Sequence, residues 1–319
     1  MAAKKPAKKQ AATKISLRGF GGTAAKPSKE AAAAGSAGDG TLIRDASTLA
    51  LYQWLDSAGV DMRKIAIADF GGLRGVMALE DIKKGQCIIE VPAKSAIDLG
   101  DEGTPGSPDL TTTDFFTEAE LAMLQWPPVV DETRRRIALC EKLYEDVIKM
   151  QVQMGSAFNG KQVTVEDLKW AVFIVVSRVL TVVRGDDVRF AKLLIPGIDM
   201  FNHDASSPHV LTGRMAAGAS LKVLAGADVK AGTQVNIAYS GGVPRSDRFI
   251  QDYGFLDAAG CSEADAILLA GSLGKRYEAQ LRETTAAEDQ ALLEGGTLSP
   301  KEALAVQFRL ALKTGTIRK

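Results

Sequence analysis

The stretch Ile195-Pro-Gly-Ile-Asp-Met-Phe-Asn-His203 is the most informative part of this chain. It places an aspartate, an asparagine and one of only two histidines inside an apolar run that is bounded by prolines. Polar side chains buried among apolar ones must find hydrogen-bonding partners. We therefore interpret Asp199, Asn202 and His203 as candidate site residues.

Two tyrosine segments follow downstream of this stretch. Asn236-Ile-Ala-Tyr239 and Asp252-Tyr253-Gly-Phe255 lie on either side of a glycine-rich turn. Taken alone, Tyr239 alternates with apolar neighbours and is equally compatible with an ordinary strand tyrosine. Its interpretation therefore depends on the other segments.

An apolar segment upstream carries a third candidate. Thr164 and Asp167 form a capping-box pattern, which predicts a helix from Thr164 to about Val183. Apolar residues cover both sides of this segment, so we expect a buried helix. Ser177 and Arg178 interrupt it, and a buried guanidinium needs an anionic or carbonyl partner. Arg178 belongs either to a structural salt bridge or to a ligand site.

The composition excludes several classes of function. Hydrophobic residues make up 46% and charged residues 24% of the 319 positions, which is typical of a globular protein. The 39 basic and 39 acidic residues cancel, so nothing global indicates binding to nucleic acid or an anionic membrane. Three scattered cysteines and two histidines fit a reducing compartment and do not indicate a metal site. No apolar run approaches the ~18 residues of a membrane span.

The order of predicted elements indicates an α+β fold of small sheets with a helical insert at about 111–185 and a helical C-terminal piece, in which Ser299-Pro-Lys-Glu302 predicts a helix start. Residues 1–40 are rich in Ala, Lys and Gly, which predicts a disordered basic tail, with an organelle transit peptide as the alternative. Two similar phrases, 78–86 and 225–233, each predict a tight turn that leads into a strand.

Four motifs in order resemble the SET-domain protein methyltransferases, in the class of the Rubisco large-subunit lysine methyltransferase. Gly72-Leu-Arg-Gly75 with Asp81-Ile-Lys-Lys-Gly85 resembles the first SET motif, and 198–203 resembles the Asn-His motif. Segments 237–239 and 252–255 resemble the closing tyrosine motifs, while the Ser177-Arg178 pair matches one that precedes the Asn-His motif. The resemblance covers roughly residues 45–319.

The resemblance implies a SET domain over 41–258 and a partial C-terminal helical substrate-binding domain over 259–319. It also implies S-adenosyl-L-methionine as the methyl donor and a lysine side chain of a protein as the acceptor. The resemblance assigns cofactor binding to Leu73, Arg74, Arg178, Asn202 and His203. It assigns catalysis to Tyr239, and substrate binding to Ser177, Asp199 and Tyr253.

The substrate expected from this resemblance is a non-histone protein, because the terminal cysteine cluster of histone-methylating relatives is missing. Asp204 stands where the family often has Ser, and Asp247 stands where Asn is common, which leaves substrate choice open. The alternatives are a protein-histidine methyltransferase and a catalytically silent SET-like protein-binding module. We expect an intracellular protein of the cytoplasm or nucleus, or of a plastid if the tail is a transit peptide. The sequence does not indicate an oligomeric state.

Overall fold

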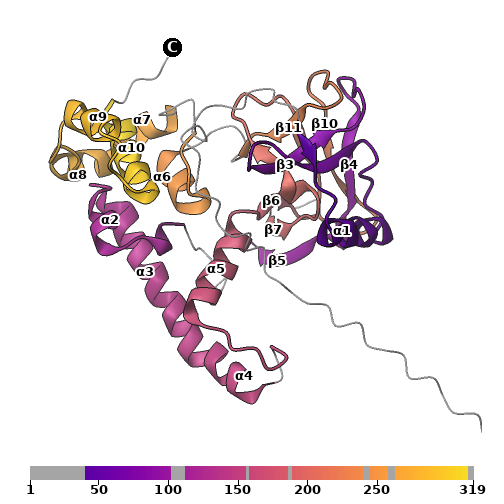
Figure 1. The fold of residues 1–319 in the computed structure, drawn as a ribbon, viewed down its shortest axis with the longest axis horizontal. Coiled ribbons are helices and arrows are strands. Elements are labelled where there is room, and N and C mark those ends of the chain that lie inside the picture. The colour runs from indigo at the N-terminus through magenta and orange to yellow at the C-terminus, as the bar shows by residue number, and fades with distance from the viewer. Residues whose placement is uncertain are drawn as a thin grey trace, which may run out of the picture. The chain divides into compact units, whose positions relative to one another are not determined.

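The computed structural model describes residues 40–101, 112–155, 158–185, 189–239, 245–257 and 263–314. The predicted disordered tail therefore lies outside the described residues, except for its last position. Three small sheets form within the described part of the chain (Figure 1). The first has five strands in the order β1 (Thr41–Leu42), β2 (Ile65–Asp69), β3 (Arg74–Ala78), β11 (Gln234–Ile237) and β8 (Asn202–His203).

The other two sheets have three strands each. One has the order β4 (Cys87–Pro92), β10 (Ser220–Leu224) and β9 (Val210–Gly213). The other has the order β5 (Ile97–Asp101), β7 (Phe190–Leu194) and β6 (Leu180–Val183). The named strands pair antiparallel except β8 and β11, which run parallel and place Asn202 beside Asn236 and His203 beside Ile237. This pairing brings the Asn-His segment next to the strand that leads to Tyr239.

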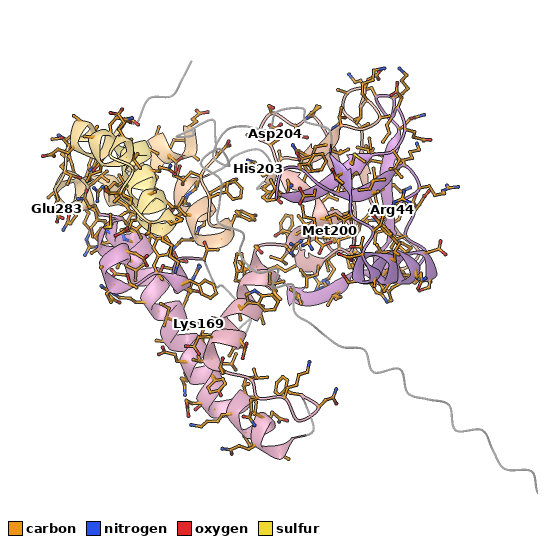
Figure 2. The ribbon with its side chains drawn as sticks, in the orientation of Figure 1. Arg44, Lys169, Met200, His203, Asp204 and Glu283 are labelled. Carbon is orange, nitrogen blue, oxygen red and sulfur yellow. The ribbon has the colours of Figure 1, made fainter. Side chains whose placement is uncertain are left out.

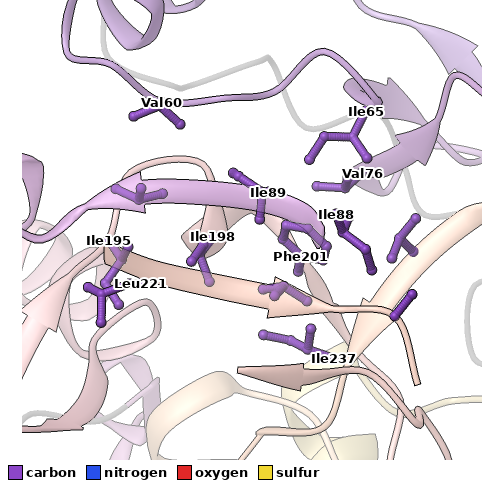
Figure 3. Packing of buried hydrophobic residues seen from close by; sticks show 14 of the residues in the cluster. Val60, Ile65, Val76, Ile88, Ile89, Ile195, Ile198, Phe201, Leu221 and Ile237 are labelled. Carbon is purple, nitrogen blue, oxygen red and sulfur yellow. The ribbon is translucent and has the colours of Figure 1, made fainter. Parts of the chain in front are cut away.

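All three sheets contribute side chains to one apolar core (Figure 3). Ile195, Ile198 and Phe201 belong to it and are at most 1% exposed. Ile198 begins the short 3₁₀ turn η4 (Ile198–Met200), and Phe201 lies between this turn and strand β8. The apolar residues of the stretch thus anchor it in the core, and the polar residues between them are held in fixed positions. Burial of three such side chains stabilises this arrangement by several kcal/mol, at about 1.5–3 kcal/mol each.

A run of helices follows β5 where the helical insert is predicted, although the last of these helices is shorter than predicted. Its elements are η2 (Thr112–Phe115), α2 (Glu118–Ala122), α3 (Pro127–Leu143), the π turn η3 (Tyr144–Ile148), α4 (Lys149–Met154) and α5 (Val165–Val176). Helix α1 (Ala46–Ser57) lies before the insert and packs Leu55 into the core. The Thr164 capping box is present as predicted: Asp167 N donates to Thr164 Oγ1, and Asp167 Oδ2 accepts from Thr164 N.

Two expectations for the 164–183 segment are wrong. Helix α5 ends at Val176, and Leu180–Val183 form strand β6, which pairs with β7. The β-branched residues that end this segment are stiff at χ1 and fit a pleated sheet better than a helix. The helix is not buried all round, because Trp170 is 42% exposed and the buried residues of α5 are Val172 and Val176. An apolar pattern gives no information about whether neighbouring elements cover each side of a helix.

The C-terminal helices are α7 (Glu263–Ala270), α8 (Ser272–Leu281), α9 (Ala286–Glu294) and α10 (Pro300–Thr314). Helix α10 begins as predicted, because Glu302 N donates to Ser299 Oγ and Glu302 Oε2 accepts from Ser299 N. Its side chains share a second apolar core with α2 and α3. Arg309 Nη1 also donates to the carbonyl of Met123 at 2.8 Å. The C-terminal helices therefore pack on the insert.

The two similar turns contact each other. Ile82 and Val229 form an antiparallel bridge, and both side chains are buried. Lys230 Nζ lies 2.8 Å from Asp81 Oδ2, and the reciprocal pair Lys83–Asp228 measures 2.9 Å. Each carboxylate also accepts a main-chain N–H from the opposite turn. The repeated phrase is thus the basis of a local two-fold contact between β3–β4 and β10–β11.

Among the described residues, no helix has the length and apolar character that crossing a bilayer requires.

Candidate functional site

The turn between β2 and β3 presents the first predicted site residues. Gly71 and Gly72 have φ of 70° and 94°, a left-handed conformation that favours glycine. Asp69 Oδ1 accepts the N–H of Gly72 at 2.7 Å and closes the turn. Leu73 is consequently lifted to the surface, where its side chain is 57% exposed. Arg74 follows at the start of β3 and is half-buried.

Asn202 connects this turn to the Asn-His segment. Its Nδ2 donates a 2.9 Å hydrogen bond to the carbonyl oxygen of Arg74. Gly75 makes this contact possible, because a Cβ at this position would lie 2.6 Å from Gln234 Nε2 and 2.7 Å from Asn202 Nδ2. The glycine of the first motif is therefore required by the close approach of two amide side chains.

Arg178 has a carbonyl partner, as expected for a guanidinium that is largely removed from solvent. Its Nη1 donates to the main-chain oxygen of Asp199 at 2.7 Å and lies 3.9 Å from the carboxylate of the same residue. Burial lowers the pKa of Arg74, and the charge of Arg178 lowers it further. Burial raises the pKa of Asp199, although Arg178 opposes the change. Two guanidinium groups thus lie near the carboxylate of Asp199, and the carboxylate of Asp45 also acts on Arg74.

Tyr239 is fixed at both ends. Its main-chain N–H donates to His203 Nδ1 at 3.0 Å, and its hydroxyl donates to the carbonyl oxygen of Phe201 at 2.6 Å. Burial raises the pKa of the Tyr239 phenol far above its usual value, and Tyr253 adds to this effect. The charges of Arg178 and Asp199 also act on this phenol, so both groups lie within electrostatic range of it.

Aromatic rings surround His203 and Tyr239. The ring centroid of His203 lies 5.1 Å from that of Tyr239 and 4.8 Å from that of Phe249. Tyr239 and Tyr253 are 4.9 Å apart, and Phe255 is 6.0 Å from Tyr253. These separations fall in the range of favourable aromatic pairs. The cluster places aromatic rings around Tyr239, and Phe249 is its fully buried member.

A π-helical turn positions Tyr253. After α6 (Ser246–Arg248), the chain continues as η6 (Phe249–Tyr253) and reverses at Gly254, whose φ is 75°. Isolated π turns are frequent at functional sites because they re-aim side chains. Ion pairs from Arg136 to Asp252, at 3.9 Å, and from Arg248 to Glu132, at 3.1 Å, hold this turn against α3. The helical insert therefore supports the tyrosine.

The structure brings most of the predicted site residues together. Asn202 meets Arg74, Arg178 meets Asp199, His203 meets Tyr239, and Tyr239 meets Tyr253 (Figure 2 labels Met200 and His203 of the central segment). Ser177 ends α5 directly before Arg178, and its hydroxyl donates to the carbonyl of Ile174 at 3.4 Å. Leu73 belongs to the candidate site through its main-chain position in the turn, since its side chain is exposed. His209, which we expect at the surface, is in fact half-buried.

Sequence reasoning missed four contributors to the site. They are the Phe201 carbonyl, the rings of Phe249 and Phe255, and the carboxylate of Asp257, which lies 3.5 Å from His203 Nε2. A main-chain carbonyl carries no sequence signal. Asp257 directly follows the apolar Phe255-Leu256 pair, and a charged residue at that place was the available clue. Among the described residues, no group of three His, Cys, Asp or Glu side chains could hold a metal ion.

Comparison with known proteins identifies the fold. No protein-family model matches the chain, and no curated protein sequence matches it at a significant level. Solved structures do match. The SET domain of LSMT bound to MeLysine and AdoHcy aligns with a TM-score of 0.61 at 18% identity, covering 86% of this chain and 90% of that one. Rubisco LSMT bound to Sinefungin and Monomethyllysine aligns with a TM-score of 0.57 at 18% identity, covering 85% and 89%.

A third structure, Rubisco LSMT bound to AdoMet, aligns with a TM-score of 0.56 at 18% identity, covering 85% of this chain and 89% of that one. Identities this low establish the fold and no more. The chain has the SET fold, and the predicted α+β class with small sheets is confirmed.

Proposed function

We propose that this chain is an S-adenosyl-L-methionine-dependent protein-lysine N-methyltransferase. The observation that carries the proposal is the convergence of Tyr239 with Asn202 and His203, contributed by two separate segments, beside the Arg178–Asp199 pair. Of four similar solved structures, two hold AdoHcy, one holds AdoMet and one holds Sinefungin, and three hold a lysine or a methylated lysine. Their ligands support the proposal by analogy of fold.

The residues present fit the proposed methyl donor. S-Adenosyl-L-methionine carries a carboxylate, and the neighbouring guanidinium groups of Arg74 and Arg178 are of the kind that binds one. We assign Leu73 and Arg74, through their main chain, together with Arg178, Asn202 and His203, to holding the cofactor. When bound, the cofactor supplies an electrophilic methyl group. Gly75 supports this assignment, because a side chain there would displace Asn202.

The assigned role of Tyr239 follows from its hydrogen bond. Its only proton is donated to the Phe201 carbonyl, so the lone pairs of the hydroxyl oxygen remain available as acceptors. Such an oxygen can contact a polarised methyl group through C–H···O interactions, each worth about 0.5–1 kcal/mol. The raised pKa keeps this phenol neutral, so Tyr239 orients and stabilises and does not act as a base. Alignment is the main contribution that such a transfer requires.

The acceptor lysine must reach the site without its proton. A free lysine has a pKa of about 10.4, and a largely apolar channel lowers it. We assign Tyr253, Ser177 and Asp199 to lining this channel. The aromatic rings around Tyr253 provide apolar surface for this channel, and the Asp199 region provides polar groups at its edge.

The finer proposal is a non-histone protein substrate that docks through a partial C-terminal domain. We propose a boundary near residue 258 between the SET domain and this domain. The packing of α10 on α2 and α3 supports a docking role, because it attaches these helices to the insert that holds Tyr253.

The experiment combines cofactor binding with methyl transfer. Calorimetry measures binding of S-adenosyl-L-methionine, and a lysate is then incubated with methyl-labelled cofactor and analysed by mass spectrometry. Labelled lysine supports the proposal, whereas labelled histidine identifies the alternative acceptor. Cofactor binding without any transfer identifies a silent binding module.

A matched pair of variants links the activity to the site. Tyr239→Phe removes the proposed catalytic hydroxyl. Tyr52→Phe removes a half-buried hydroxyl that accepts the N–H of Ile67 at 2.7 Å outside the site. Transfer that is lost in the first variant and kept in the second supports the assignment. Equal activity in both contradicts it.

A further inference from the structure

The imidazole of His203 lies between two partners. Its Nδ1 accepts the main-chain N–H of Tyr239 at 3.0 Å. On the opposite side of the ring, its Nε2 lies 3.5 Å from Asp257 Oδ2. The side chains of His203 and Asp257 are only 4% and 10% exposed, so water competes little for this contact. Asp257 comes from the segment after the π turn, and no role has been assigned to it above.

The first contact decides which nitrogen of the ring carries the proton. In a neutral imidazole one nitrogen donates and the other accepts. Because Nδ1 accepts from Tyr239, the proton of the neutral ring must lie on Nε2. That proton points toward the carboxylate of Asp257, which can only accept when ionised. The two hydrogen bonds therefore select the same tautomer.

We propose that Asp257 is a positioning residue for Tyr239, acting through His203. This inference rests on the proposed function and adds a residue to it. Without the carboxylate, the ring is free to carry its proton on Nδ1, where it would face the Tyr239 N–H as a second donor. That repulsion would move the start of the Tyr239 segment and weaken the hydrogen bond from its hydroxyl to Phe201. The Tyr239 hydroxyl would lose its fixed place in the site.

The chain contains an internal reference for this effect. His209 is the other histidine, and its Nδ1 also accepts a main-chain N–H, from Gly226 at 3.2 Å. Nitrogen NMR of protein labelled in histidine therefore gives signals from just two rings. A His209→Gln variant assigns them. Substitution of Asp257 should alter the ring-nitrogen signals of His203 and leave those of His209 unchanged.

The test compares Asp257→Ala with Asp257→Asn by NMR and by steady-state kinetics at a pH where both histidines are neutral. We expect Asp257→Ala to shift the His203 ring nitrogens toward a tautomer mixture and leave those of His209 unchanged. We expect kcat for methyl transfer to fall by about 10- to 100-fold, the cost of a small misplacement of a reacting group. Asp257→Asn retains an acceptor oxygen. Its His203 ring-nitrogen shifts and its kcat should therefore both lie close to those of the wild type.

Asp265→Asn separates positioning from stability. Asp265 is fully buried and accepts from the N–H and the hydroxyl of Ser246, both at 2.9 Å. Its loss should lower the melting temperature without changing the His203 ring signals. Unchanged His203 signals in Asp257→Ala, or changed signals with an unchanged kcat, would overturn the proposal.

Failure of the proposed function gives a different result. In that case the wild-type protein transfers no methyl group to any protein. The His203 ring signals and the Tyr239 amide proton then still decide whether Asp257 fixes the His203–Tyr239 hydrogen bond.

Discussion

The hydroxyl of Tyr239 donates a 2.6 Å hydrogen bond to the carbonyl oxygen of Phe201, one residue before Asn202. This bond ties the end of β11 to the central segment from which Asn202 and His203 also project. The proposed catalytic hydroxyl and the proposed cofactor residues therefore share one rigid support, because Phe201 is itself anchored in the core. Changes to this support should affect the chemistry more than the fold.

Removing the Tyr239 hydroxyl should mainly affect turnover. We expect Tyr239→Phe to lower kcat by at least about tenfold, which corresponds to about 1.4 kcal/mol of transition-state stabilisation. The dissociation constant of the cofactor should change little, since the hydroxyl is bonded to protein. The free energy of unfolding should fall by about 0.5–1.5 kcal/mol, the usual worth of one hydrogen bond. Kinetics, calorimetry and chemical denaturation measure the three quantities, and a large loss of stability would contradict this division.

The Tyr239 phenol should not ionise within the working pH range. Its pKa is raised by burial and by Tyr253, so the folded state holds this proton more tightly than the unfolded state does. The stabilising effect is therefore complete below the unfolded pKa of about 10 and is lost as pH rises through the folded value. We expect kcat/KM to rise with pH as the substrate amine deprotonates, with the same shape in Tyr239→Phe. If the pH profile of kcat/KM has a rise or fall in the wild type that is missing in Tyr239→Phe, the phenol titrates and this prediction is wrong.

Gly75→Ala should weaken cofactor binding. A Cβ at residue 75 would press on the amide of Asn202, which would lose its hydrogen bond to Arg74. We expect a loss of about 1–3 kcal/mol of stability from overpacking, with a weaker affinity for S-adenosyl-L-methionine. Gly295→Ala is the matched control, because a Cβ there meets ordinary contact distances at a φ of −63°. Equal affinity in the two variants would remove Asn202 from the cofactor site.

The C-terminal helices should depend on one buried carboxylate. Asp289 is fully buried and lies 2.7 Å from Arg309 and 2.6 Å from Lys313. We expect Asp289→Asn to cost about 3–5 kcal/mol, because two buried cations lose their partner. Glu278→Gln breaks an exposed pair with Arg282 and should cost less than about 1 kcal/mol. Denaturant titrations compare the two variants.

The same carboxylate predicts an acid dependence. Burial raises the pKa of Asp289, but its hydrogen bonds to Arg309, Lys313 and Thr284 outweigh that effect and leave the pKa lowered. Its contribution to stability is thus present above the unfolded pKa of about 3.9 and is lost as pH falls through the folded value. The wild-type protein should lose stability over this range, and Asp289→Asn should lose less. Identical acid profiles would assign the acid sensitivity to other groups.

Local rules predicted part of this molecule correctly. The capping boxes at Thr164 and Ser299 form because the partners are three residues apart and need no tertiary structure. The helix that was extended to Val183 shows the limit of such rules, since the pairing of β6 with β7 decided its last residues. The repeated sequence at 78–86 and 225–233 predicts two similar turns. Only the fold shows that the two turns contact each other, through the antiparallel bridge between Ile82 and Val229.

The sequence by itself determined the SET fold class, the order of the motifs and the residue types of the candidate site. Tertiary structure alone decided which polar groups meet. Asn202 and Arg74 are 128 residues apart in sequence, His203 and Tyr239 are 36 apart, and His203 and Asp257 are 54 apart. Contacts of this kind depend on the register of β8 with β11 and on the reversal at Gly254, which are set by the packing of the whole core. Local sequence carries propensity, whereas a hydrogen bond needs two atoms within about 3 Å, a distance that only the folded chain defines.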